Sequence, residues 1–409
     1  MNSLDTGDTA WLIVATALVL VMTPALAFFY GGMVRKKNLL STLNLSFIMM
    51  GLISIQWVLF GYTLSFGNSI GGFVGSLKFA GLSGVGSAPA AGYATTVPQL
   101  GFATYQMMVA IITVALITGA FVERVKFKAF LIFALLWTTL VYDPVAHWVW
   151  GVGGWIRDLG ALDFAGGTVV HVLAGFSALA FAMVIGQRKG YGTYSMGPVS
   201  IPYTVLGAGL LWMGWFGFNG GSAFGANGLA FTAIINTNTA AAAACLVWMM
   251  LSWQVDGKPS VLGIATGAIV GMVAITPAAG YVAPWAAIVI GGVAALISYY
   301  AIRFRQRSKL DESLDVFACH GLGGAWGVLA TGLFATTSVN AVGANGLFYG
   351  NPGQLLIQAA AVGATIMFSF LLTFAIAKVL NWTVGLRVSE LEEEVGLDIS
   401  EHGERAFAA

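Results

Sequence analysis

The chain has 409 residues, of which 58% are hydrophobic and only 9% are charged, and its formal net charge is +1. An ordinary soluble domain carries about 25% charged residues, so a soluble fold of this size could not solvate its surface. A nearly neutral chain also has no electrostatic attraction for nucleic acid. This composition excludes a soluble enzyme, a nucleic-acid binder and a disordered scaffold. We predict an all-α integral membrane protein.

Eleven stretches are apolar and long enough to cross a bilayer, which takes about 20 residues. They cover residues 10–32, 40–66, 99–121, 127–150, 167–186, 201–219, 230–253, 260–277, 284–304, 316–336 and 354–384. The loop 67–98 is rich in Gly, Ser and Ala and is expected to be irregular. We divide the chain into a transmembrane domain, 1–385, and an acidic tail, 386–409. The tail is expected to be a solvated segment with room for a short helix.

The basic residues give the direction of the spans. Of the 18 Lys and Arg residues, 16 fall in one set of alternate loops and in the C-terminal region, and only Lys78 and Arg157 fall in the other set. Basic loops mark the cytoplasmic side. We therefore predict a multi-pass protein of the cell membrane with its N-terminus outside and its tail in the cytoplasm. A missed or added span would disrupt this alternation.

Two histidines suggest that ten of the spans form two halves. His171 lies in the fifth span and His320 in the tenth, and each is followed four residues later by a glycine, Gly175 or Gly324. If the halves are inverted five-helix repeats, these two helices are equivalent, and transporter sites often lie at such an interface. The internal similarity is weak, so an arrangement without repeats stays open.

Ionisable groups inside a membrane cost about 2.5–3.5 kcal/mol each and are functional candidates by default. The candidates are Asp143, His147, Asp163, His171, Asp315 and His320. Neutral imidazole has one donor and one acceptor nitrogen. If His171 and His320 are in contact, they can share a proton and line an apolar path without adding charge. The alternative is two unrelated histidines bonded to backbone carbonyls.

Asp163 lies eight residues before His171 and directly before a glycine-rich turn. Its carboxylate can accept backbone N–H bonds at the start of the next helix, which favours the ionised form. We favour this structural role. A second role, compatible with the first, is to stabilise a cation in a vestibule above a pore.

Aromatic residues gather at the predicted outer side, with Trp150 at the end of the fourth span and Phe218 near the end of the sixth, four residues before Ser222. Interfacial tryptophans usually form only a belt at the membrane surface. The alternative is a cage of ring faces and a hydroxyl group that holds a small cation. No phosphate-binding loop, hydrolase motif or thiolate zinc pattern is present, so we expect no enzyme activity, cofactor or metal.

Six motifs in order carry a resemblance to a known family. They are FYGG at 29–32, GAFVER at 119–124, DFAGGTVVH at 163–171, GWFGFNGGS at 214–222, DVFACHG at 315–321, and TVGLRV at 383–388 with GLD and HGE in the tail. Over nearly its whole length the chain resembles the ammonium transporter (Amt/Rh) family, Amt branch. The resemblance implies a homotrimer in the membrane lipid, with eleven helices and one pore per subunit. Each pore would pass between two inverted five-helix repeats, which a C-terminal helix completes.

The resemblance also assigns roles to single residues. The twin histidines of the family fall on His171 and His320, and its vestibule aspartate falls on Asp163. The outer ammonium site falls on Trp150, Phe218, Ser222 and Tyr105, and the two gate positions fall on Phe218 and Val109. The tail resembles the segment that docks cytoplasmic PII-type (GlnK) regulators.

Two departures from the family pattern affect this site. Val109 occupies the position of the upper gate ring and has no aromatic face, so Tyr105, Met108 or a shifted ring would have to close the vestibule. The stretch from Trp150 to Asp163 is one residue longer than the usual pattern.

The implied function is ammonium transport. Ammonium would be recruited at the outer aromatic site and deprotonated, and ammonia would pass the two histidines, with the route of the proton left open. Two other classes stay open: an ammonium sensor with little flux, and a membrane metalloenzyme with His171, His320 and Asp163 as ligands.

Overall fold

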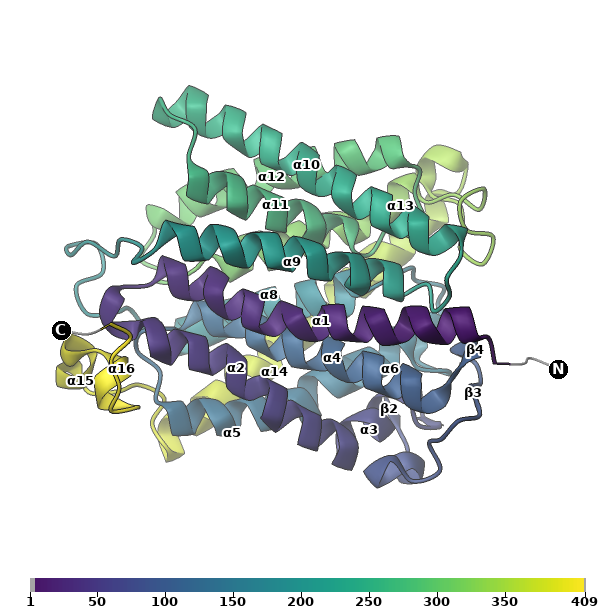
Figure 1. The fold of residues 1–409 in the computed structure, drawn as a ribbon, viewed down its shortest axis with the longest axis horizontal. Coiled ribbons are helices and arrows are strands. Elements are labelled where there is room, and N and C mark those ends of the chain that lie inside the picture. The colour runs from purple at the N-terminus through teal and green to yellow at the C-terminus, as the bar shows by residue number, and fades with distance from the viewer. Residues whose placement is uncertain (1–3, 408–409) are drawn as a thin grey trace.

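The computed structural model describes residues 4–407 and consists mainly of long helices that run along one axis (Figure 1). In Figure 1, α1 to α6 occupy the lower half of the bundle and α9 to α13 the upper half. The N-terminus and the C-terminus lie at opposite ends of this axis. The symbol η denotes short 3-10 or π-helical segments.

The first half of the chain contains the following helices and strands. They are α1 Thr6–Met33, η1 Lys36–Asn38, α2 Leu39–Gln56, η2 Trp57–Gly61, α3 Tyr62–Phe66, β1 Ser69–Ile70, β2 Val74–Gly75, η3 Leu77–Leu82, β3 Pro89–Ala90, β4 Ala94–Pro98, α4 Gln99–Ile117, η4 Thr118–Ala120, α5 Phe127–Trp137, η5 Thr138–Tyr142, α6 Asp143–Trp150, α7 Trp155–Asp158, η6 Gly167–Val172 and α8 Leu173–Ile185.

The second half is almost entirely helical. It contains α9 Ile201–Gly221, α10 Gly228–Asp256, α11 Val261–Ile275, α12 Pro284–Gln306, η7 Phe317–Leu322, α13 Gly323–Phe334, η8 Leu347–Tyr349, α14 Pro352–Thr383, α15 Glu390–Val395 and α16 Leu397–Ser400.

The predicted all-α membrane architecture is confirmed. Within residues 4–407, ten helices are long and apolar enough to cross a membrane. The eighth predicted span, 260–277, corresponds to α11, which has only 15 residues. The count of eleven therefore stays a prediction. The positions of the two chain ends favour it, because an odd number of crossings leaves the ends on opposite sides.

The loop 67–98 is more regular than expected. It contains two small antiparallel pairs, β1 with β2 and β3 with β4. The first pair turns at Gly71 and Gly72, which both have positive φ. Glycine adopts this conformation without steric cost, so the many glycines of the loop allow tight hairpins.

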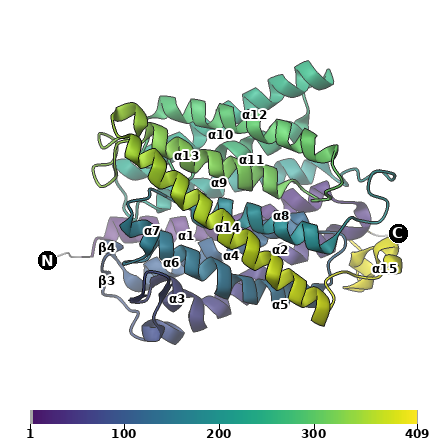
Figure 2. The same cartoon turned by 180° about the vertical axis from the view of Figure 1, so that it is seen from behind.

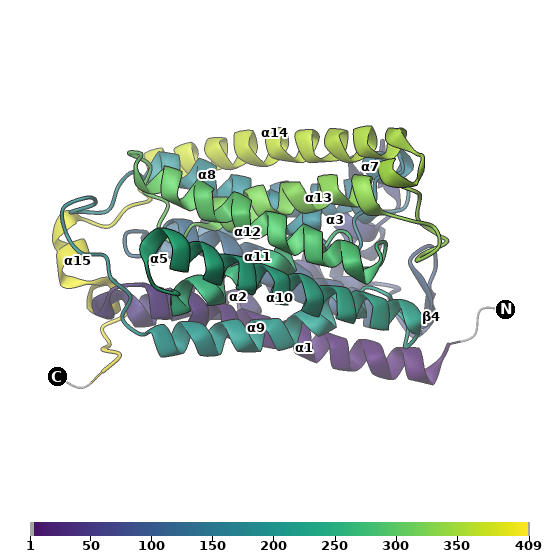
Figure 3. The same cartoon turned by 90° about the horizontal axis from the view of Figure 1, so that it is seen from above.

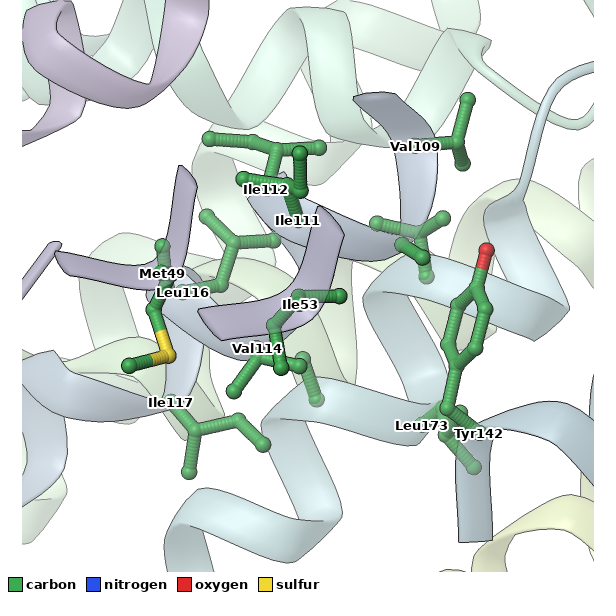
Figure 4. Packing of buried hydrophobic residues seen from close by; sticks show 14 of the residues in the cluster. Met49, Ile53, Val109, Ile111, Ile112, Val114, Leu116, Ile117, Tyr142 and Leu173 are labelled. Atoms are coloured by element: carbon green, nitrogen blue, oxygen red, sulfur yellow. The ribbon is translucent and has the colours of Figure 1, made fainter. Parts of the chain in front are cut away.

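The apolar core lies between the helices rather than around a sheet. Figure 4 shows Met49 and Ile53 of α2 among Val114 and Ile117 of α4, and all four side chains are buried. The long helix α14 crosses the back of the bundle obliquely (Figure 2). Seen from above, it forms one edge of the bundle, and α1 and α9 form the opposite edge (Figure 3).

The helices that carry the two histidines cross at very close range. A Cβ atom on Gly175 would lie 2.1 Å from the backbone nitrogen of Gly321, and one on Gly324 would lie 2.8 Å from Cβ of His171. Each glycine thus packs directly against the helix that carries the other histidine, where a side chain would clash. Small residues allow this approach of two backbones in a membrane. This contact explains why a glycine follows each histidine by four residues.

The prediction of a solvated tail is wrong for its central part. Glu393, Leu397 and Asp398 are buried. The backbone nitrogen of Leu397 donates to the side chain of Asn38 at 2.9 Å, and the Asp398 carboxylate accepts from the nitrogen of Ser41 at 2.8 Å. The tail folds back because it bonds polar groups of η1 and of the first turn of α2. Composition does not reveal this contact between distant segments.

A buried ion cluster lies under the tail. Glu123 pairs with Arg35 at 2.9 Å and with Arg188 at 2.6 Å, and Arg188 also pairs with Asp311 at 2.8 Å. Burial alone would raise the pKa of Glu123, but Arg188 and Arg35 lower it to about 2. The basic residues of these loops therefore do more than mark the cytoplasmic side, because they join four loops in one network.

The close crossing of the histidine helices gives a test of packing. Gly175→Ala should destabilise the protein by about 3 kcal/mol, the upper end of the range for overpacking, because the new methyl group meets backbone atoms that cannot move aside. Gly363→Ala in α14 is the control, since a Cβ there meets nothing within 4 Å. The measurement is thermal unfolding in detergent. Equal stability of the two variants would show that the crossing is looser than described.

Candidate functional site

Three cavities follow one another through the bundle. The outer one has a volume of about 410 Å³ and is lined by Tyr105, Val109, Trp150, Asp163 and Ser222, among others. A narrow one of about 10 Å³ lies at the two histidines, and an inner one of about 570 Å³ shares His320 with it. About 10–15 Å³ is the space that a single water molecule needs. The middle of this path therefore has room for one small molecule at a time.

The two histidines are in direct contact, as the paired prediction requires. Their Nδ1 atoms lie 3.2 Å apart, and both residues are almost fully buried. One Nδ1 must donate and the other accept, so two neutral rings in opposite tautomers satisfy this bond. Among the described residues neither ring bonds a backbone carbonyl, which removes the alternative of two unrelated histidines.

The surroundings of the pair are apolar. The narrow cavity is lined by side chains of Met, Leu, Ile and Val, together with Trp215 and Phe218. The Trp215 ring stacks on His171 at 5.4 Å between centroids, and its indole N–H donates to Thr276 at 2.9 Å. Trp215 therefore fixes the plane of the His171 ring without adding charge.

Asp163 caps the helix that carries His171. Its two carboxylate oxygens accept four backbone N–H bonds at 2.7–3.2 Å, from Gly166, Gly167, Thr168 and Val169. Gly166 makes the turn with φ of +122°. Hydrogen bonds from four N–H donors favour the ionised form of the Asp163 carboxyl. The predicted structural role is therefore present, and the same residue also lines the outer cavity.

An acidic residue occupies the equivalent place before the second histidine. Glu312 lies eight residues before His320, the same spacing as in the first half. It accepts from the backbone nitrogens of Val316 and Phe317 at 2.7 and 3.1 Å. Both histidine helices thus begin on a buried carboxylate, which supports the two inverted repeats. Glu312 was not predicted from the sequence, although its spacing from His320 is the same as that of Asp163 from His171.

Trp150 lies at the wall of the outer cavity. Its indole N–H donates to the backbone carbonyl of Asp163 at 3.0 Å, and the backbone carbonyl of Trp150 accepts from the Arg157 guanidinium at 2.6 Å. The longer stretch between Trp150 and Asp163 contains the short helix α7. The additional residue therefore leaves the contact between the tryptophan and the aspartate intact.

Tyr105 and Ser222 form the opposite part of the wall. Their hydroxyl oxygens lie 3.1 Å apart, and the Tyr105 hydroxyl also donates to the carbonyl of Phe218 at 2.5 Å. Ser222 donates to the same carbonyl at 2.9 Å. These bonds place two hydroxyl groups at the end of α9, facing the outer cavity.

The two gate positions lie at different depths. Val109 lines the outer cavity, whereas Phe218 lines the narrow one, with its ring 6.3 Å from the His171 ring. Phe218 was predicted both for the outer ammonium site and as the lower ring of the gate. Its ring lies beneath the cavity that Val109 lines, in agreement with the lower gate position rather than with the outer site.

Three other candidates have different surroundings. Asp143 accepts from Gln56 at 2.8 Å, and His147 bonds Ser65 and Ser69, each at 2.9 Å. Neither candidate lines any of the three cavities. Asp315 lines the inner cavity and pairs with Arg305 at 2.5 Å.

Two further residues of the outer cavity were not predicted. Arg157 had been counted only as an outer-loop charge, and Phe224 follows the GWFGFNGGS motif without being part of it. Nothing in one sequence points to Phe224, since its place depends on an unusual backbone turn.

The structure does not support a metal site formed by His171, His320 and Asp163. Both Asp163 oxygens are taken by backbone N–H groups. Within residues 4–407, no three His, Cys, Asp or Glu side chains are grouped so that they could hold a metal ion.

Comparison with known proteins agrees with the resemblance in the motifs. The sequence pattern of the Ammonium Transporter Family matches residues 10–407. An ammonium transporter of Bacillus subtilis is 52% identical over 98% of both chains, and the ammonium transporter Amt1 of Archaeoglobus fulgidus is 51% identical over 98% of this chain and 99% of its own length.

Solved structures give the same picture. The crystal structure of Saccharomyces cerevisiae Mep2 is similar with a TM-score of 0.89 at 36% identity, covering 94% of this chain and 88% of Mep2. A protein described as a sensor Amt protein is similar with a TM-score of 0.89 at 28% identity, covering 97% of this chain and 98% of its own. The chain belongs to the ammonium transporter family and is a membrane transport protein, not an enzyme.

Proposed function

We propose that the protein recruits ammonium in the outer cavity, removes its proton as it passes from that cavity to the narrow one, and conducts ammonia past His171 and His320 to the inner cavity. The observation that carries this proposal is the narrow cavity of about 10 Å³ with two mutually bonded histidines in an apolar wall. Such a passage accepts a small neutral molecule and opposes an ion.

Recruitment of the cation rests on the outer cavity. Ammonium resembles the lysine head group, which titrates near about pH 10, so it is almost entirely charged in neutral water. The Trp150 ring can attract it by a cation–π contact, and the Ser222 hydroxyl can accept its N–H bonds. The buried Asp163 carboxylate below adds a negative field at the same cavity.

Deprotonation follows from desolvation. Moving the cation from the outer to the narrow cavity removes its water shell, which lowers the pKa of ammonium and favours ammonia. Phe218 lies at this transition and separates the two cavities. Potassium has no proton to lose, so it remains charged and is excluded.

The histidine pair offers hydrogen bonds along the dry passage. His171 Nε2 has no partner among the described residues, so it is free to bond ammonia. The released proton either crosses separately along the histidine pair or returns outside, and only the first route makes transport electrogenic.

Assembly, orientation and regulation complete the proposal. The positive-inside pattern supports a protein of the cell membrane with its N-terminus outside and its tail in the cytoplasm. Three subunits would form the homotrimer, each with its own pore. A PII-type regulator would dock on the tail together with the basic loop at Arg35, Lys36 and Lys37.

Sensing is the second candidate function. The sensor Amt protein named above shares the fold over nearly the whole chain. A sensor would bind ammonium in the outer cavity with little flux. Tight binding without transport would favour this function.

The first test removes the two histidines of the narrow cavity, which are proposed to relay ammonia. His171→Ala together with His320→Ala should reduce ammonium transport at least about 10-fold, since each lost hydrogen bond to a passing molecule in a dry site costs about 1–3 kcal/mol. The measurement is ammonium uptake into proteoliposomes, with potassium as the competing cation. Unchanged ammonium flux and unchanged exclusion of potassium would contradict the relay.

A second test addresses the vestibule carboxylate. Asp163→Asn should abolish most ammonium transport and lower the unfolding temperature, because an amide cannot accept all four N–H bonds and carries no charge. Asp158→Asn is the matched control, since Asp158 is exposed on α7 nearby. Normal ammonium uptake by Asp163→Asn, with normal stability, would remove both roles of this residue.

A third test addresses regulation. Deletion of residues 386–409 should weaken binding of the PII-type protein from the same organism at least about 10-fold, provided that the truncated protein stays monodisperse in detergent. Lys78→Gln, on the opposite face, should bind it normally. We would abandon the role of the tail if binding to the truncated protein were unchanged.

A further inference from the structure

Phe224 combines two features beside the outer cavity. It lines that cavity together with Ser222 and Trp150. Its backbone has a φ of +49°, in the left-handed region. A bulky residue there is a genuine outlier, and such strain persists chiefly where the surrounding structure or the function requires it.

The turn after α9 produces this conformation. The nitrogen of Phe224 donates to the carbonyl of Gly221 at 2.9 Å, which turns the chain sharply after the last helical residue. The next residue is Gly225, for which a left-handed conformation would be free of strain. The chain nevertheless places the ring at the strained position and thereby holds it beside the cavity.

The neighbours hold the Phe224 ring in place. It meets the Tyr105 ring edge-on at 5.7 Å and the Phe102 ring at 5.2 Å. The Tyr105 hydroxyl in turn lies 3.1 Å from that of Ser222. One layer of contacts therefore joins the Phe224 ring to the hydroxyl group that faces the cavity.

Other ring faces of this cavity are less suited to hold a cation. The Tyr93 ring already carries the Arg157 guanidinium at 5.6 Å. The Phe218 ring lies deeper, in the narrow cavity, and position 109 has a valine in place of a ring. A cation that enters the outer cavity meets Trp150 on one side. Of the other rings that line this cavity, Tyr105 and Phe224 lie beside Ser222, and the Tyr105 hydroxyl is already bonded to the carbonyl of Phe218, so Phe224 is the ring there without a polar partner.

We propose that Phe224 supplies the second aromatic face of the outer ammonium site, in place of the ring that position 109 lacks. The proposal rests on the proposed function, because it assigns a binding role at the same cavity. A ring acts here by a cation–π contact, which an aliphatic side chain of similar size cannot provide.

The test compares variants with and without an aromatic side chain at position 224. Phe224→Leu should raise the half-saturating ammonium concentration about 3- to 10-fold and leave the maximal rate per protein nearly unchanged, whereas Phe224→Tyr should keep the wild-type value. Val342→Leu is the matched control, since it exchanges one aliphatic side chain for another on the same cavity at a position with no proposed role in the ammonium site. The readout is the ammonium concentration dependence of transport in proteoliposomes, in which half-saturation does not depend on the amount of protein.

Each result bears on one of the two proposals. If wild-type protein does not transport ammonium, the proposed function fails. If wild type transports but Phe224→Leu keeps the wild-type half-saturation, or Phe224→Tyr shifts it as much as Phe224→Leu does, only the role of Phe224 fails. Phe224→Met serves as a second ringless variant if Phe224→Leu does not reconstitute.

Discussion

The cost of placing a charge in an apolar passage is the constraint on which the rest of the structure depends. Removing a cation from water without compensating partners is strongly unfavourable, so a dry pore must either provide charges or strip the proton. The narrow cavity is lined by apolar side chains and two histidines that bond each other. Its size and lining are therefore arranged for a neutral molecule, and recruitment of the cation is left to the outer cavity.

The same constraint explains the architecture around the histidines. Two polar rings can meet in the membrane interior only if their helices approach closely, and Gly175 and Gly324 make that approach possible from both sides. Each helix then begins on a buried carboxylate, Asp163 or Glu312, eight residues earlier. The carboxylates fix the starts of the two helices. The contact between the two histidines and the walls of the outer and inner cavities therefore depend on one another.

Much of this was predictable from the sequence, because apolar length, basic loops and intramembrane histidines follow directly from the energetics of a bilayer. The cap formed by Asp163 was predictable as well, since its partners are only three to six residues away. The burial of Leu397 and the place of Phe224 were not. They depend on contacts between distant segments and on a strained turn, neither of which leaves a periodic signal.

The most direct measurement records the current from wild-type proteoliposomes on a solid-supported membrane after pulses of ammonium and then of potassium. If the proton is removed and crosses separately, ammonium gives a sustained current that depends on liposome size, and potassium gives none. If no charge crosses, a pH-sensitive dye inside the liposomes should still report entry of ammonia. A sustained potassium current would contradict exclusion of intact cations, and silence in both assays would contradict transport itself.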